Sequence, residues 1–121
     1  MRIKKIKIKD VKSMLDDFVK TGEAIERGEK VKPVKGQEVY FTSFEALRKV
    51  LTPKRQELLH IIKIKKPASI NELARIAKRD LKNVADDVKY LEQVGLIERK
   101  KTANRTAPVV TYDKLSFEMA V

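Results

Sequence analysis

The segment from Ser69 to Gly95 constrains the fold most, because helix start and stop signals follow each other there at short intervals. Ser69 and Glu72 form a capping box. In such a box the serine hydroxyl bonds the backbone N–H three residues on, and the glutamate side chain reaches back. The pattern predicts a short helix from Ile70 to about Ala77.

A second helix is expected directly after the first. Residues 78–79 are expected to form a brief turn, and Asp80 to cap a helix that runs to about Val94. Its apolar face consists of Leu81, Val84, Ala85, Val88 and Leu91. Gly95 is the residue expected in the left-handed conformation after the helix end. A short helix, a tight turn and a longer helix predict a helix-turn-helix.

The residues after this unit predict a hairpin. Residues 96–101 (LIERKK) start a strand, residues 102–108 (TANRTAP) are expected to form a polar loop, and residues 109–112 (VVTY) return as a second strand. A basic hairpin directly after the second helix is typical of a wing. The alternative is an incidental helical hairpin beside a surface ribbon, but the pattern L-x-x-x-G-L-I at 91–97 favours the winged helix-turn-helix.

The rest of the chain predicts an arm and two further helices. Residues 2–9 alternate Ile and Lys and predict a strand with a basic outer face. Residues 11–25 have helical spacing, and residues 29–38 have the composition of a linker. Helices are also expected at 44–51, with Phe44 on the apolar face, and from Pro53. We therefore expect a mainly α fold with small β elements: a strand-plus-helix arm at 1–38, and a winged helix-turn-helix domain at 39–121.

Composition excludes several classes of function. The chain has 121 residues, no cysteine and one histidine. Thiolate chemistry is excluded, and His60 has no second histidine with which to hold a metal ion. We predict no catalytic residue, no metal and no cofactor. No apolar run approaches the roughly 20 residues of a membrane helix, so we expect a cytoplasmic protein without a membrane partner.

The net charge points to a polyanion. Lys and Arg number 28 against 17 Asp and Glu, which gives +11. Residues 1–12 carry +5, residues 13–47 carry −2 and residues 48–121 carry +8. The alternative is the Lys- and Glu-rich surface of a heat-adapted protein. Heat adaptation, however, raises the numbers of positive and negative residues together. The excess of positive charge therefore favours nucleic acid as the partner.

The chain resembles a family of small bacterial and archaeal winged-helix transcriptional regulators, distantly similar to MarR- and ArsR-type repressors. The resemblance lies in FTSFEALRKVLTPKR (41–55), INELA (70–74), RDLKNVADDVKYLEQVGLI (79–97) and VTYDKLSFEM (110–119). It implies a winged helix-turn-helix that binds DNA. Some members of the family look like antitoxins, which implies a toxin-like protein partner as well. At Ala85 and Asp86 the family tends to carry His-Arg, so its usual base-contacting chemistry does not carry over there.

Three groups of residues are candidates for contact with double-stranded DNA. Those on the second helix and its turn are Arg79, Lys82, Asn83, Asp86 and Lys89. Those on the wing are Arg99, Lys100, Lys101, Asn104 and Arg105. Ser69 and Asn71 could present backbone N–H groups to a phosphate, although capping alone explains Ser69. An ordinary solvated surface is the alternative for each group.

The apolar stripe of the arm predicts self-association. Its members are Met14, Leu15, Phe18, Val19 and Ile25. We expect them to pair across a two-fold axis, and the function to be transcriptional repression by a DNA-bound homodimer. Two alternatives stay open: an antitoxin-like protein that binds a toxin and regulates its own synthesis, and an architectural winged-helix protein within a larger nucleic-acid assembly.

Overall fold

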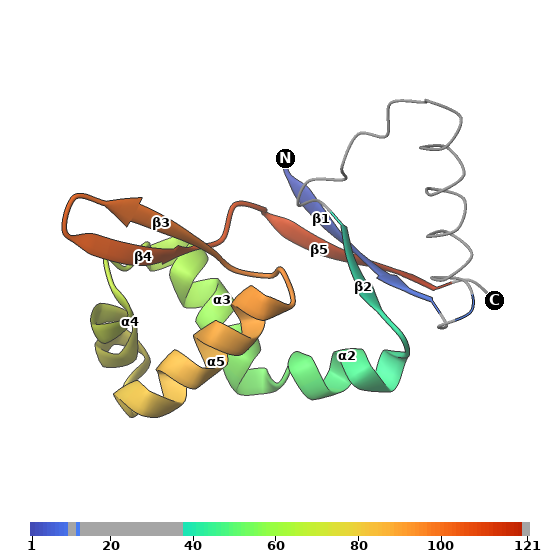
Figure 1. The fold of residues 1–121 in the computed structure, drawn as a ribbon, viewed down its shortest axis with the longest axis horizontal. Helices are drawn as coiled ribbons and strands as arrows, with labels where there is room; N and C mark the ends of the chain where they lie inside the picture. Colours follow the sequence, from blue (N-terminus) through green and yellow to red (C-terminus); the bar gives the residue numbers. More distant parts are fainter. Residues whose placement is uncertain (10–11, 13–37, 120–121) are drawn as a thin grey trace, which may run out of the picture.

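The computed structural model describes residues 1–9, 12 and 38–119. Figure 1 shows a sheet with a set of helices on one side of it and a separate hairpin at the opposite end of the molecule. In chain order the elements are β1 (Ile3–Ile8), β2 (Glu38–Phe41), α2 (Phe44–Val50), α3 (Pro53–Lys65), α4 (Ile70–Ala77), α5 (Leu81–Gln93), β3 (Glu98–Thr102), β4 (Arg105–Val109) and β5 (Lys114–Met119).

The larger sheet joins the two ends of the sequence. Its strand order is β2-β1-β5, and both neighbours run parallel to β1. Ile6 is aligned with Val39 on one side and with Phe117 on the other. The strand expected at 2–9 is therefore present, but its place at the centre of a parallel sheet was not predicted, nor was β5.

The alternation expected in β1 is confirmed. Ile6 and Ile8 are buried against the helices, and Lys5 is exposed on the other face. Lys4 also points inward and keeps only 6% of its surface exposed. Its ammonium lies 5.9 Å from the centre of the Tyr112 ring, whose hydroxyl donates a 2.8 Å hydrogen bond to the carbonyl of Leu96. These contacts tie β1 to the start of the hairpin.

The core is formed by apolar faces that the spacing predicts, with two exceptions. Leu58, Leu73 and Val84 are fully buried. Phe44 is 52% exposed and Leu81 is 47% exposed, so their assignment to the core was wrong. Both are first residues of their helices, where a helix end extends beyond the elements that pack against its middle.

The predicted boundary between the arm and the winged domain lies at residue 38, and the structure describes only part of the arm. Strand β1 lies between two strands of the predicted winged domain, so it is part of that domain's sheet. Apart from Lys12 and Glu38, the predicted helix and linker lie outside the described residues, and so do all five candidate dimerisation residues (Met14, Leu15, Phe18, Val19 and Ile25). An arm that mediates dimerisation therefore stays a proposal.

Gly95 gives a direct test of how the second helix ends. Its φ is +90°, and the backbone N–H of Leu96 bonds the Leu91 carbonyl at 2.9 Å. A side chain here is strained because left-handed backbone costs non-glycine residues roughly 1–2 kcal/mol. We expect Gly95→Ala to lower the free energy of unfolding by about that amount in urea titrations. Exposed Gln93→Ala, two residues earlier, is the control and should change it by less than about 0.5 kcal/mol.

Candidate nucleic-acid interface

Helix α4 begins with the predicted cap. The Ser69 hydroxyl accepts a hydrogen bond from the Glu72 backbone N–H at 3.1 Å. The Glu72 carboxylate accepts one from the backbone N–H of Ala68 at 3.2 Å, one residue before the position that a standard capping box uses. The cap is therefore confirmed, and it occupies the Ser69 hydroxyl. Asn71 is the second residue of α4 and is exposed.

The turn between α4 and α5 is tight. Lys78 adopts the left-handed conformation with a φ of 55°, and the Arg79 backbone N–H bonds the Ala74 carbonyl at 3.1 Å. The Asp80 carboxylate then accepts a hydrogen bond from the Asn83 backbone N–H at 3.3 Å, which makes it the predicted cap of α5. These local bonds hold the two helices at a defined angle, as a helix-turn-helix requires.

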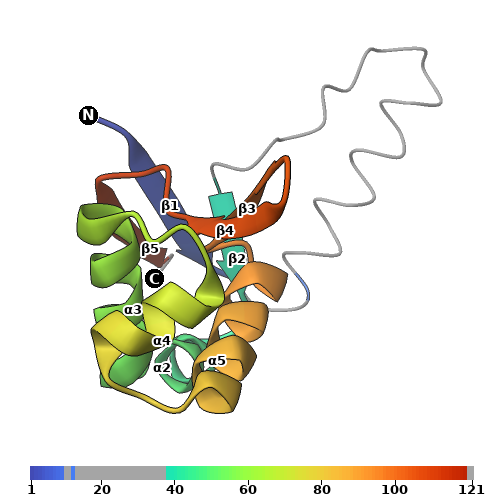
Figure 2. The same ribbon diagram turned by 90° about the vertical axis from the view of Figure 1, so that its left-hand side faces the viewer.

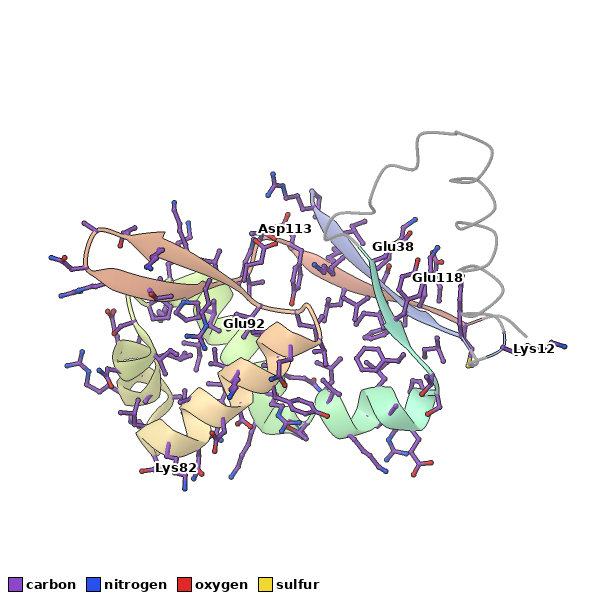
Figure 3. The ribbon with its side chains drawn as sticks, in the orientation of Figure 1. Lys12, Glu38, Lys82, Glu92, Asp113 and Glu118 are labelled. Carbon is purple, nitrogen blue, oxygen red and sulfur yellow. The ribbon has the colours of Figure 1, made fainter. Side chains whose placement is uncertain are left out.

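Helix α5 is anchored on one face and open on the other. Val84, Val88 and Leu91 are fully buried. The candidate contacts Lys82, Asn83, Asp86 and Lys89 are all exposed on the remaining surface. Figure 3 shows Lys82 projecting away from the body of the protein near the start of α5. In the part of the chain that the structure describes, no ion pair joins Asp86 to Lys82 or Lys89, although helical spacing allows one.

Arg79 is held inside a charged cluster that the sequence did not predict. Its guanidinium donates to the Asp87 carboxylate at 2.7 Å, and the Arg55 guanidinium from α3 donates to the same carboxylate at 3.1 Å. Arg55 also bonds the carbonyls of Lys49 and Val50 and lies 4.6 Å from the centre of the Tyr90 ring. The side chains of Arg79 and Asp87 are only 19% and 16% exposed. The cluster braces α5 against α3.

The wing has a shorter tip than predicted, because its second strand begins at Arg105 and not at Val109. Strands β3 and β4 pair in antiparallel register from Glu98↔Val109 to Thr102↔Arg105, which leaves a two-residue turn at 103–104. The polar loop predicted at 102–108 was therefore wrong. All of β3 is exposed, so the hydrophobic alternation that marks a strand is absent from its sequence.

Within the described part of the chain, four of the predicted wing residues form no ion pair and the fifth forms one. Lys100, Lys101, Asn104 and Arg105 are exposed along the hairpin and its tip. The Arg99 guanidinium instead forms an ion pair with Glu92, which Figure 3 labels at the end of α5. Arg99 thus links the base of the wing to α5.

Two open grooves join the wing, α4 and α5 into one surface. A groove of about 440 Å³ runs between the start of α4 and the wing tip, lined by Ser69, Asn71, Glu72, Arg75, Asn104, Arg105 and Thr106. A second, of about 690 Å³, lies beside the turn and is lined by Asn71, Ala74, Arg75, Lys78, Arg79 and Leu81. Arg75 borders both grooves and Lys78 borders the second. Neither residue was predicted as a contact, and their positive charge is the only signal in the sequence that could have identified them.

The shifted pKa values lie at the sheet and away from this surface. The backbone N–H of Arg2 and the Lys63 ammonium lower the pKa of Asp113. The Tyr40 hydroxyl and the Lys7 ammonium lower the pKa of Glu38, and burial raises the pKa of Tyr112. In the described part of the chain, no cluster of three or more His, Asp or Glu side chains could hold a metal ion, and no helix is long and apolar enough to cross a membrane.

The family is established by sequence. The model of the family HVO_A0114 matches residues 50–117, which is more than half of the chain and runs from the end of α2 into β5. The chain belongs to the HVO_A0114 family. In this member the matched region contains the helix-turn-helix, the wing and the Arg55–Asp87–Arg79 cluster. No curated protein is similar enough in sequence to match the chain.

This HVO_A0114 protein has a winged helix-turn-helix fold, and three solved structures are similar to it. A predicted DNA-binding transcriptional regulator from E. coli has a TM-score of 0.50 at 19% identity, over 78% of this chain and 84% of that one. MepR of Staphylococcus aureus has a TM-score of 0.47 at 16% identity, over 82% and 64%. The homodimeric domain of Mb0332 from Mycobacterium bovis, a possible ArsR-family regulator, has 0.46 at 13% identity, over 81% and 67%.

Proposed function

We propose that this protein binds double-stranded DNA sequence-specifically and regulates transcription, as a repressor that acts as a dimer. The observation that carries the proposal is the continuity of one surface: the start of α5, the start of α4 and the wing tip lie at the same end of the molecule. Figure 2 looks onto this end. Helix α5 is the element that enters the major groove, and the wing contacts the adjacent backbone or minor groove.

Charge and chemistry assign a role to each part of this surface. Lys100, Lys101 and Arg105 neutralise phosphates, which provides affinity without reading sequence. Asn83 has the amide that suits adenine, and Asp86 the carboxylate that suits the amino group of cytosine. Arg75 and Lys78 join the predicted contacts as phosphate ligands beside the turn. Arg79 and Arg99 act mainly by positioning α5 and the wing, because Asp87 and Glu92 hold their guanidinium groups.

Selection of bound duplexes from a random pool tests the proposal. We expect a short, sharply defined motif, because α5 presents amide, carboxylate and ammonium groups to base edges. Enrichment of duplex without a motif would favour an architectural role. An absence of binding at low salt would contradict the DNA-binding function altogether.

Asp86 is expected to lower the overall affinity for DNA and to raise discrimination between base pairs. Its carboxylate repels phosphates, so Asp86→Ala should tighten binding to random duplex while it weakens discrimination at one or two base pairs by about 1–3 kcal/mol each. Competition titrations with single-base variants of the selected site measure both effects. Glu45→Ala, an exposed carboxylate on α2, should leave discrimination unchanged. If Asp86→Ala tightens binding to every sequence and leaves the motif intact, Asp86 contacts no base.

A further inference from the structure

Strand β5 is an edge of the sheet that the described residues form. In the described part of the chain it pairs with β1 alone, and its other side has no strand beside it. Figure 2 shows it at one margin of the sheet. An edge of this kind offers a row of backbone N–H and C=O groups to any strand that can align with it. Phe117 and Met119 on the same strand are 53% and 60% exposed.

The side chains of β5 divide between the two faces of the sheet. Leu115, Phe117 and Met119 are aligned with Lys4, Ile6 and Ile8, whose side chains point toward the helices. Lys114, Ser116 and Glu118 point to the other face. Figure 3 shows Glu118 at the far end of the sheet from Asp113, which comes just before the strand. Glu118 approaches Lys5 at 4.0 Å, and both side chains are about half exposed, so this contact leaves the carboxylate accessible.

From this pattern we propose that β5 pairs with β5 of a second copy, antiparallel, about a two-fold axis at Ser116. An axis normal to the sheet keeps each face continuous, so residues that oppose each other must lie on the same face. Side chains alternate between the two faces along a strand, so an axis between two residues would oppose residues of different faces. Only an axis that passes through a residue of β5 satisfies the condition. An axis at Ser116 sets Lys114 of each copy opposite Glu118 of the other, and Leu115 opposite Phe117.

Neighbouring registers lack this complementarity. An axis at Phe117 sets Glu118 opposite Ser116, and an axis at Leu115 sets Lys114 opposite Ser116. Charged residues normally protect edge strands from pairing. Here their opposite signs lie at equal distances from Ser116, so they favour one register, because unlike charges stabilise a cross-strand pair and like charges destabilise it. The exposed Phe117 also gains a cross-strand apolar partner.

This interface differs from the arm interface predicted from sequence, and the dimer itself does not depend on the proposed DNA-binding function. Each wing adjoins the start of its own β5 through residues 110–113 (Figure 1). Antiparallel pairing therefore places the two wings at opposite ends of the dimer, and each protomer engages its own stretch of duplex.

Charge exchange tests the register. By analytical ultracentrifugation we expect a dimer for the wild type and monomers for Lys114→Glu and for Glu118→Lys, because each variant sets like charges opposite each other twice. An equimolar mixture of the two variants should form dimers again, since both mixed pairs are then of opposite sign. This recovery also shows that both variants are folded. Glu45→Lys and Lys49→Glu, exposed on α2, are the matched controls and should remain dimers.

Disulfide formation tests the position of the axis. The chain has no cysteine, so Ser116→Cys introduces a single thiol. Directly opposed residues of antiparallel strands have Cα atoms about 4.5–5.5 Å apart, within the range of a disulfide. We expect an oxidised dimer on gels. Lys114→Cys is the control, because its two thiols would lie about 13 Å apart along the strands, at roughly 3.3 Å per residue.

Three results would overturn the proposal: a monomeric wild type, single charge variants that remain dimers, or crosslinking of Lys114→Cys in place of Ser116→Cys. If Phe18→Glu alone abolishes the dimer, the arm is the interface. Lys114→Glu should still bind one short duplex per protomer through its wing and α5. Failure of the interface and failure of DNA binding are therefore separate outcomes.

Discussion

Replacement of Lys100, Lys101 and Arg105 by alanine is expected to weaken binding to every duplex about 100-fold at 0.15 M salt. Each phosphate neutralised contributes about 0.9 to the slope of log affinity against log salt, which is roughly a factor of five per contact at this concentration. Loss of three contacts should reduce the slope by about 2.7. The three side chains are exposed and make no ion pair within the described residues, so the folded state should be little affected.

Fluorescence anisotropy at several salt concentrations measures both quantities. The matched control replaces Arg48, Lys49 and Lys54, three exposed cations at the junction of α2 and α3, and removes the same net charge. It should lower affinity slightly through the overall field and leave the slope close to that of the wild type. An equal loss of slope in the two triple variants would mean that the wing is not part of the DNA surface.

Asp87→Ala is expected to reduce the free energy of unfolding by about 2–3 kcal/mol. It removes the acceptor of two guanidinium groups and leaves Arg55 and Arg79 close together with like charges. Removal of one partner from a fully buried ion pair costs about 3–5 kcal/mol. The cost here is smaller because the three side chains keep 16–21% of their surface exposed. Urea titration measures the change.

The neighbouring carboxylate provides the control for this test. Asp86 is exposed and makes no ion pair among the described residues, so Asp86→Ala should change the unfolding free energy by less than about 0.5 kcal/mol. Two adjacent aspartates on one helix thus have opposite expected effects: Asp87 on stability, and Asp86 on base discrimination. Equal unfolding free energies for the two variants would mean that the cluster does not brace α5.

The helix-turn-helix could be predicted from sequence because its signals are local. The caps Ser69 and Asp80 bond the backbone three residues further on. Gly95 has the positive φ that the end of the helix requires and that glycine adopts without strain. The buried positions Val84, Val88 and Leu91 recur at helical spacing. Such signals depend on atoms within one or two turns, so no tertiary structure is needed to detect them. The exposed face of α5, with its candidate base contacts, follows from the same periodicity.

The tertiary structure alone decided which distant segments meet. Strand β1 pairs with β5, which lies more than a hundred residues away in the sequence. The Asp87 carboxylate accepts hydrogen bonds from Arg55 of α3 and from Arg79 of the turn. The sequence around each partner is compatible with many neighbours, because strand pairing uses backbone groups that every residue carries, and ion pairs use charges that are abundant in this chain. The bounds of the predicted wing strands were wrong for a related reason: β3 has no buried face, so no hydrophobic alternation marks where it begins and ends. What the chain determines locally is the helix-turn-helix, and what only packing determines is the sheet that carries it, in which β5 is the edge next to β1 among the described strands.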